Sequence, residues 1–360
     1  MDILEAIAQQ LSANDPNEEI LSQIQSDERP VEDFVMAREE LIIAPHRHKK
    51  KIYLDLKFWL ELRKIVLKTN TTAEYIPVYE RLSELVSSGK AICPVSYPMT
   101  FELLKQSDLQ TRRSTAQIMS DLSQGVAFKY SIYDISALEI QNTAHFISTG
   151  EIRDLAQFCW TDYFGMIGID EIIANDDQND LVIRKYMLTM LSNINFADAI
   201  ALLRDEDISE YLGETAHVKD LLNAGKKQNA QAYTSYRELE DQEWIGAIRS
   251  IISLFPELNG VLSKVSSLDQ IRSLKRQLMP FLVAYSGLHA SIRFDQKRQY
   301  KDNDDFDIEH GAYALGYFDV FLTEKSLGHL IANAPGNYAQ FFNVLSAVQP
   351  TEAMALLQSL

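Results

Sequence analysis

DDFDIEHGAYALGYFDVFLTE, residues 304–324, joins an acidic cluster to a helix and then to a strand. The acids open a short amphipathic helix, and its apolar face recurs at helical spacing: Ile308, Ala312 and Leu315. The apolar run 320–322 then predicts a buried strand ending at an acid. In an open α/β sheet, ligands bind beyond the carboxyl ends of the strands. We therefore expect Asp307 at the start of the helix and Glu324 after the strand to converge.

The composition indicates a globular protein with a sizeable core. The chain has 360 residues, of which 46% are hydrophobic, and its formal net charge is -17. No apolar run is long enough to span a bilayer, and the N-terminus lacks the basic and apolar regions of a signal peptide. Cys93 and Cys159 form no CxxC pair, which argues against a disulfide framework and favours reduced thiols. These features predict a cytoplasmic protein with no membrane association.

The negative charge argues against non-specific coating of nucleic acid, because phosphate binding relies on Lys and Arg. A small site needs only a local basic tract, and the sequence has three, at 47–51, 112–113 and 293–301. Taken singly, a tract of this kind is typical of a solvated surface. Charge alone therefore leaves nucleic-acid binding open.

An earlier part of the chain also places acids after predicted strands. The run 51–56 predicts a strand with Asp55 near its end, and a helical pattern follows. A second strand is predicted at 91–96, and Glu102 lies in the helix after it. A third strand is predicted at 126–130. The pattern is that of an α/β fold with a parallel sheet flanked by helices.

The chain divides into segments of different pattern. Between about 134 and 294 the sequence has a continuous helical pattern with no fixed-period repeat. This stretch is as long as a domain. We predict an N-terminal helical arm at 1–48 that includes a short helix at 3–11, an α/β core in two parts at 49–133 and 295–360, and a mainly α-helical insert at 134–294. The tail beyond Gly328 is predicted to form one or two closing helices.

Gathering the acids in one place would require a cation. Any one of them is typical of a helix cap or a surface acid. Several carboxylates together repel one another, and the usual reason to gather them is a hard divalent cation such as Mg²⁺ or Mn²⁺. A site of this kind polarises a phosphate and activates water.

The order of these residues resembles the PIN-domain ribonucleases. The resemblance covers about 50–133 and 300–335, and it implies a Rossmann-type parallel sheet with an acidic metal site that cuts RNA. It implies that Asp55, Glu102 and Asp307 bind the metal and that Glu324 is a less uniform fourth acid. The helical insert is much larger than in compact members of the family. Asp304 and Asp305 also compete with Asp307 for the third position.

Other residues are candidates for contact with the substrate. His310 lies on nearly the same helix face as Asp307, where it could hydrogen-bond an acid or a phosphate. Thr323 could hydrogen-bond a carboxylate or position water. The loop 293–301 interleaves aromatic residues with cations and suits single-stranded RNA, although an exposed connector would look the same. Its candidate contacts are Lys297, Arg298 and Lys301.

These observations favour a Mg²⁺- or Mn²⁺-dependent endoribonuclease with a PIN-like core. Neither GxGxxG nor GxxxxGK[ST] occurs, which argues against kinases, NTPases and dinucleotide enzymes. A non-catalytic PIN-like binding or regulatory protein and a DNA nuclease that uses the same site remain alternatives. The sequence also leaves open a protein partner or inhibitor bound through the helical insert, and a homo-oligomer.

Overall fold

A computed structural model of the protein describes residues 18–69, 72–176, 179–192, 194–202, 218–229, 233, 235–260, 269–333 and 335–360. The helix predicted at 3–11 lies outside the described residues. Among the helices of these ranges, none combines the length and the apolar character needed to cross a membrane.

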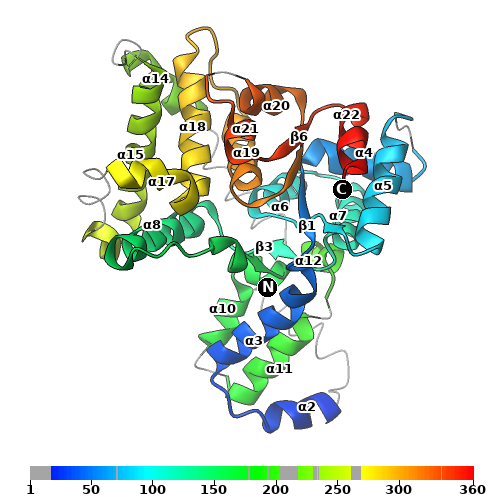
Figure 1. The fold of residues 1–360 in the computed structure, drawn as a ribbon. Coiled ribbons are helices and arrows are strands. Elements are labelled where there is room, and N and C mark those ends of the chain that lie inside the picture. The colour runs from blue at the N-terminus through cyan, green and yellow to red at the C-terminus, as the bar shows by residue number, and fades with distance from the viewer. Residues whose placement is uncertain are drawn as a thin grey trace.

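Four parallel strands form the central sheet, in the order β2-β1-β5-β6 (Figure 1). The strands are β1 (Lys50–Leu54), β2 (Ala91–Ile92), β5 (Val320–Leu322) and β6 (Leu345–Ala347). The last three residues of β1 and all of β5 are completely buried, as expected for strands covered by helices on both faces. The predicted α/β class, a parallel sheet flanked by helices, is therefore confirmed.

Helices from both ends of the chain flank the sheet (Figure 1). In Figure 1 the helices α4, α5 and α22 lie on one side of β1 and β6, and α19, α20 and α21 lie on the other. The helices of this region are α4 (Leu56–Val66), α5 (Tyr75–Ser87), α6 (Tyr97–Leu104), α7 (Leu109–Ser123), α19 (Asp304–Tyr317), α20 (Lys325–Ala332), α21 (Tyr338–Phe342) and α22 (Pro350–Gln358).

Two predictions about strands need correction. The tail beyond Gly328 does not consist of closing helices alone, because β6 lies within it and pairs with β5. The strand predicted at 126–130 is β3 (Ala127–Phe128), which is shorter than predicted. It pairs antiparallel with β4 (Trp160–Thr161), a strand inside the predicted insert. A parallel bridge between Val95 and Ala127 links this pair to the chain that follows β2.

The described helices of 134–294 fall into two groups. One group packs with the N-terminal helices around a small apolar cluster, seen at the bottom of Figure 1. It contains α2 (Glu18–Gln25), α3 (Val31–Ile43), α9 (Tyr163–Met166), α10 (Ile169–Ala174) and α11 (Leu181–Leu191), and α12 (Phe196–Leu202) packs on α7 nearby. Arg38 of α3 joins this group by donating to Asp162 and Asp170.

The second group packs on the core through α18 (Pro280–Phe294), which runs along α19. Its other members are α8 (Ile132–Thr149), α14 (Val218–Asn229), α15 (Tyr236–Leu254) and α17 (Asp269–Leu278). Short 3₁₀ turns lie at η1 (Ala44–His46), η2 (Leu155–Gln157) and η4 (Pro256–Leu258). The helix α19, which opens with the acidic cluster, is thus held between the sheet and these helices.

Candidate active site

The four acids singled out in the sequence line one pocket of about 300 Å³. They come from four separate segments: Asp55 follows β1, Glu102 lies on α6, Asp307 lies in the first turn of α19, and Glu324 follows β5. His310 lines the same pocket. Because β1 and β5 are parallel, their carboxyl ends meet at one edge of the sheet, and the pocket lies beyond that edge.

Asp55 is held rigidly by donors from the neighbouring strand end. The pairing of β1 with β5 brings it beside Thr323 and Glu324, and Asp55 Oδ2 accepts from Thr323 Oγ1 at 2.8 Å and from the Glu324 amide at 2.6 Å. Its other oxygen caps α4 by accepting from the Lys57 amide at 2.9 Å. Burial raises the pKa of the Asp55 carboxyl, against the effect of these donors.

Asp307 and Glu324 have carboxylates that no hydrogen bond or ion pair engages within the described part of the chain. Both are partly buried and face the pocket. Burial, and then the negative charge of Glu324, raise the pKa of Asp307 to about 7. A nearby cation would favour the ionised form of both groups, and so this pair carries the unbalanced charge of the site.

Glu102 belongs to a hydrogen-bonded chain that reaches into the core. Glu102 Oε2 accepts from His310 Nε2 at 2.9 Å, and the other ring nitrogen of His310 bonds Tyr53, whose hydroxyl lies 2.7 Å from Ser96 Oγ. Burial favours the neutral ring, but Glu102 and other nearby carboxylates raise the pKa of His310. Although burial opposes it, the same pairing lowers the pKa of Glu102. His310 therefore positions Glu102 at the pocket.

The structure separates the three acids that open α19. Asp304 is buried, and it accepts from Arg298 at 2.9 Å and from the Lys301 amide at 2.9 Å. Asp305 does not line the pocket, and burial raises its pKa. Of the three, only Asp307 lines the pocket.

The predicted substrate contacts of the 293–301 loop lie elsewhere. Neither Lys297, Arg298 nor Lys301 lines the pocket, and Arg298 is committed to Asp304. The cations that do line it come from α4, and sequence reasoning missed them: Lys57, Arg63 and Lys64. The sequence contains a signal for these cations: in the helix that follows Asp55, residues three to four apart share the face that borders the strand end.

Arg63 is the most informative of the missed residues. Its guanidinium is half-buried at the pocket, and its hydrogen bonds are to neutral partners, Gln106 at 3.5 Å and Thr115 at 3.3 Å. Lys64 instead pairs with Glu61 at 2.6 Å. Arg63 thus keeps a charge that no described carboxylate neutralises, which suits a phosphate oxygen.

Donor chemistry at the pocket suits a hard divalent cation, but the side chains do not form a ready set of ligands. Carboxylate oxygens are the ligands that Mg²⁺ and Mn²⁺ take in proteins, and two of the five carboxylates that line the pocket, Asp307 and Glu324, are unengaged. Among the described residues, no three His, Cys, Asp or Glu side chains are grouped closely enough to hold a metal. Cation binding would need rotation of Asp307 and Glu324 toward Asp55.

Comparison with protein-family models, with curated proteins and with solved structures found no match to this chain.

Proposed function

We propose that this protein is a divalent-metal-dependent endoribonuclease with a PIN-like catalytic core. The observation that carries the proposal is the convergence of Asp55, Glu102, Asp307 and Glu324 in one pocket beyond the carboxyl ends of parallel strands. Four carboxylates from four distant segments have no packing reason to meet, and their mutual repulsion has to be offset. A hard divalent cation bound by the carboxylates would offset this repulsion, and the bound cation could then act on a phosphate substrate.

The pocket residues divide into three roles. Asp307 and Glu324, which have no described partners, would turn to bind Mg²⁺ or Mn²⁺ together with Asp55, which the strand end holds in place. Glu102, fixed by His310, would orient water. The cation would polarise the phosphodiester and lower the pKa of water. Arg63 would bind a phosphate oxygen opposite the acids.

The PIN-like assignment rests on the order of elements. An acid follows β1, a second lies in the helix after β2, and a third opens the helix that leads into β5, a neighbour of β1. A buried Thr323 donates to Asp55 from the end of β5. These features support the family resemblance at the level of topology as well as motif.

One observation favours a non-catalytic binding protein as the second candidate. The described side chains at the pocket do not form a metal-ligand set, and Glu102 is already paired with His310. A PIN-like protein that binds RNA or another partner without cutting would tolerate both features. Function belongs to the site, so activity decides between the two candidates.

The deciding assay uses purified protein with total RNA, single-stranded DNA and double-stranded DNA, each with Mn²⁺, Mg²⁺ or EDTA. We expect cleavage of RNA that depends on the metal and stops with EDTA. Cleavage of DNA alone would make the protein a DNA nuclease. No cleavage of any substrate, with RNA still bound, would support the binding protein.

Asp307→Asn is the cleanest variant for this assay, because the carboxylate it removes has no described hydrogen bond to lose. We expect metal-dependent cleavage to fall at least about 100-fold, since a metal site supplies several kcal/mol of charge stabilisation. Asp305→Asn is the matched control: it lies on the same helix, is also partly buried and is outside the pocket. Equal activity in the two variants would contradict the proposed site.

Asp55→Asn is less clean, because the carboxylate accepts three hydrogen bonds with two oxygens. The amide group of Asn would turn a donor toward a backbone amide that is itself a donor. We expect a cost of about 1–3 kcal/mol in stability, and so loss of activity in this variant needs a melting curve beside it.

A further inference from the structure

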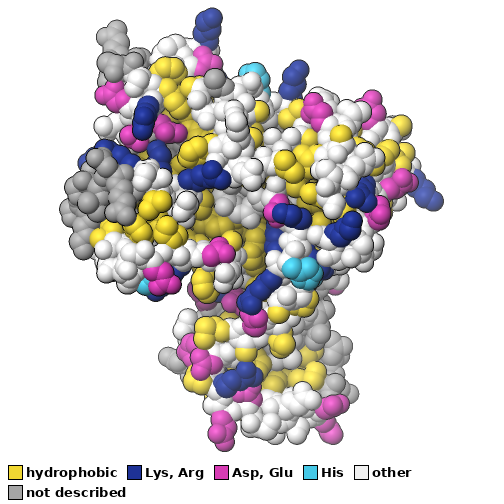
Figure 2. Space-filling view, viewed as in Figure 1, with side chains coloured by type: hydrophobic (Ala, Val, Ile, Leu, Met, Phe, Trp, Pro, Cys, Tyr) yellow, Lys and Arg dark blue, Asp and Glu magenta, His cyan; other side chains and the backbone are white. Residues whose placement is uncertain are grey.

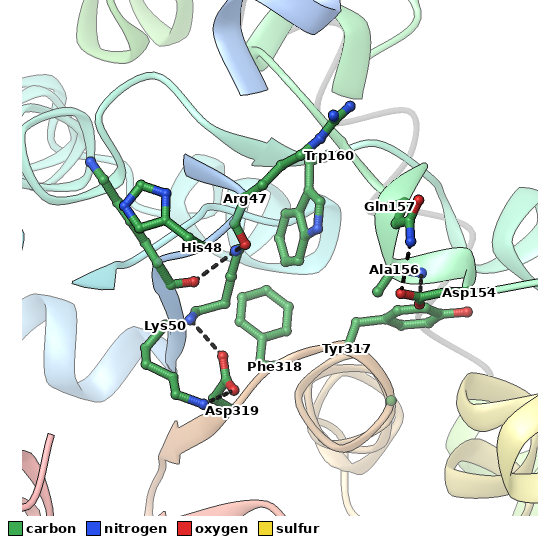
Figure 3. Close-up of a pocket in the computed structure, with 13 residues that line it drawn as sticks. Arg47, His48, Lys50, Asp154, Ala156, Gln157, Trp160, Tyr317, Phe318 and Asp319 are labelled. Carbon is green, nitrogen blue, oxygen red and sulfur yellow. Dashed lines mark hydrogen bonds and ion pairs between the residues drawn. The ribbon is translucent and has the colours of Figure 1, made fainter. Parts of the chain in front are cut away.

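A second, positively charged groove lies at the amino ends of β1 and β5, whereas the acidic pocket lies beyond their carboxyl ends. It consists of two adjoining cavities of about 740 and 360 Å³ that share four lining residues: Asp154, Ala156, Gly316 and Tyr317. The segment 47–51, which leads into β1, and Asp319, which precedes β5, line the larger cavity (Figure 3). Five residue steps along β1 separate Lys50 from Asp55, or about 17 Å of extended chain. The groove and the acidic pocket are therefore separate sites.

The larger cavity is rich in cations, although the protein carries a net charge of -17. Lys49 and Lys51 form no ion pair within the described ranges. Lys49 Nζ donates to Gln124 at 2.7 Å, and Lys51 Nζ donates to three backbone carbonyls. Arg47 pairs with the exposed Glu40, and Lys50 pairs with Asp319 at 2.7 Å. Figure 2 shows Lys and Arg side chains gathered beside a histidine near the centre of this face.

The half-buried imidazole of His46 lies among these cations. Burial, and then the positive charges of Lys49, Lys51 and His48, lower the pKa of His46 to about 4. Nearby carboxylates would act in the opposite direction. The cations of this segment therefore disfavour a positive charge on His46, in the same direction as burial.

The smaller cavity extends the cationic lining. Arg153 and Arg276 line it, and neither forms an ion pair with a described carboxylate. Arg153 bonds the ring of His145 at 3.0 Å, and Arg276 lies over the rings of Phe341 and Phe342. Both side chains are exposed, and so they remain accessible to an anion.

Aromatic rings lie between these two groups of cations, and each is less than a tenth exposed. Trp160 and Phe318 pack edge to face, with ring centroids 5.2 Å apart, and Tyr317 lies toward the smaller cavity (Figure 3). Gly316 allows this segment to come close to the start of α18, since a Cβ there would meet the Phe281 backbone nitrogen at 3.2 Å. Proteins that bind single-stranded nucleic acid commonly combine a groove lined by cations with aromatic rings.

We infer that this groove binds the backbone of single-stranded RNA, as a second site that holds a strand outside the acidic pocket. Two groups of cations, at 47–51 and at Arg153 and Arg276, offer places for more than one phosphate, which favours a strand over a single phosphorylated small molecule. The choice of RNA rests on the proposed function, whereas the groove itself rests on its charge and shape.

Substrates of different length should respond differently to the groove. A dinucleotide can occupy only one of two sites that lie at opposite ends of β1 and β5, whereas a longer strand can reach both. A long RNA gains affinity from the groove through effective concentration, while its interactions at the acids stay the same. The groove should therefore lower the KM for long RNA and leave dinucleotide cleavage unchanged.

The test compares a triple variant, Lys49→Ala, Arg153→Ala and Arg276→Ala, with wild type and with Lys227→Ala. Lys227 is an exposed lysine of α14 that lines neither site. Binding of an oligouridylate of about 16 nucleotides is measured by fluorescence anisotropy at several salt concentrations in EDTA. We expect the triple variant to raise Kd about tenfold or more, and to flatten the salt slope by about 0.7 for each phosphate that is no longer neutralised. Lys227→Ala should match wild type.

Several outcomes would overturn the inference. Unchanged Kd and salt slope in the folded triple variant would assign the groove to structure. Uridine monophosphate bound as tightly as the oligonucleotide would make it a mononucleotide site, and polyglutamate competing equally with RNA would make it a non-selective anion site. Failure of the proposed function looks different: RNA would bind in a groove-dependent way, yet no metal would support cleavage. With cleavage present, Asp307→Asn should retain groove-dependent binding while the triple variant retains dinucleotide cleavage.

Discussion

Two aspartates three residues apart on one helix illustrate how partners determine the role of a residue. Asp304 is buried, and both of its oxygens are engaged by the preceding loop, through the Arg298 guanidinium and the Lys301 amide. Asp307, one turn later, has no described partner and faces the pocket. Asp304 therefore stabilises the entry to α19, whereas Asp307 is free to bind a ligand.

Because Asp304 is bonded to Arg298 and not to Lys297, we expect these two neighbouring cations to contribute differently to stability. Arg298→Ala leaves the buried Asp304 without its charged donor, and we expect a loss of about 1–3 kcal/mol in the free energy of unfolding. Lys297→Ala removes an exposed side chain of the same loop and should change stability by less than about 0.5 kcal/mol. Chemical denaturation of both variants checks this. Equal stabilities would mean that the Arg298–Asp304 pair contributes nothing in solution.

At the scale of elements, Glu139 of α8 acts as a cap for another helix. The α18 helix starts at Pro280 and has no side-chain cap of its own. Glu139 accepts from the Phe281 amide at 2.7 Å and from the Leu282 amide at 3.0 Å, and it also accepts from the Tyr317 hydroxyl at 2.7 Å. One completely buried carboxyl thus ties together α8, α18 and α19.

Burial outweighs these donors and raises the pKa of Glu139 from 4.5 to about 8. A folded-state pKa above the unfolded one means that the folded protein binds the proton more tightly. The contribution to stability is therefore complete below about pH 4.5 and is lost as the pH rises through 8. At 1.36 kcal/mol per pKa unit, the loss is on the order of 4–5 kcal/mol.

Glu139→Gln should remove this pH dependence. The amide resembles the neutral carboxylic acid that wild type carries at pH 5, and so we expect the two proteins to have similar stability at pH 5. Between pH 5 and pH 8, the stability of wild type should fall more steeply than that of the variant. Urea denaturation at a series of pH values measures both slopes. Parallel curves would show that Glu139 does not titrate in this range.

At the scale of the whole molecule, the acidic pocket joins the two ends of the chain. Asp55 and Glu102 come from the first part of the core, and Asp307 and Glu324 come from the second part, after the long helical stretch. The strand pair β1 and β5 carries the connection. A cation bound at the pocket would therefore hold the two parts of the core together.

Mn²⁺ should raise the melting temperature, because a ligand that binds only the folded state adds about 2.7 kcal/mol at a hundredfold excess over Kd. Asp307→Asn should melt at the same or a higher temperature than wild type in EDTA, since repulsion by Glu324 is relieved, and it should lose most of the Mn²⁺ increment. Thermal melts at matched ionic strength measure both effects. Asp305→Asn is the control and should keep the increment. An identical increment in Asp307→Asn would show that Asp307 is not a ligand.

Elements with a local signal could be predicted from the sequence. The buried runs of β1 and β5 and the acids at their ends were predicted from a few consecutive residues, and pairing of parallel strands was enough to bring those ends together. Thr323 was recognised as a donor to a carboxylate for the same reason.

Features that depend on distant partners could not be predicted in this way, because they follow from how the elements pack. β6 has two of its three side chains at least partly exposed, so that no apolar run marks it, and it exists because β5 offers an unpaired edge. The choice of Asp307 over Asp304 depended on where Arg298 lies, and the pocket cations came from α4 because that helix starts at the strand end. The groove at the amino ends of β1 and β5 joins segments more than 100 residues apart. The local pattern of residues determines which face of an element is apolar. The partner of a charged side chain depends on how the elements pack against one another. The periodicity of a single sequence carries no information about that packing.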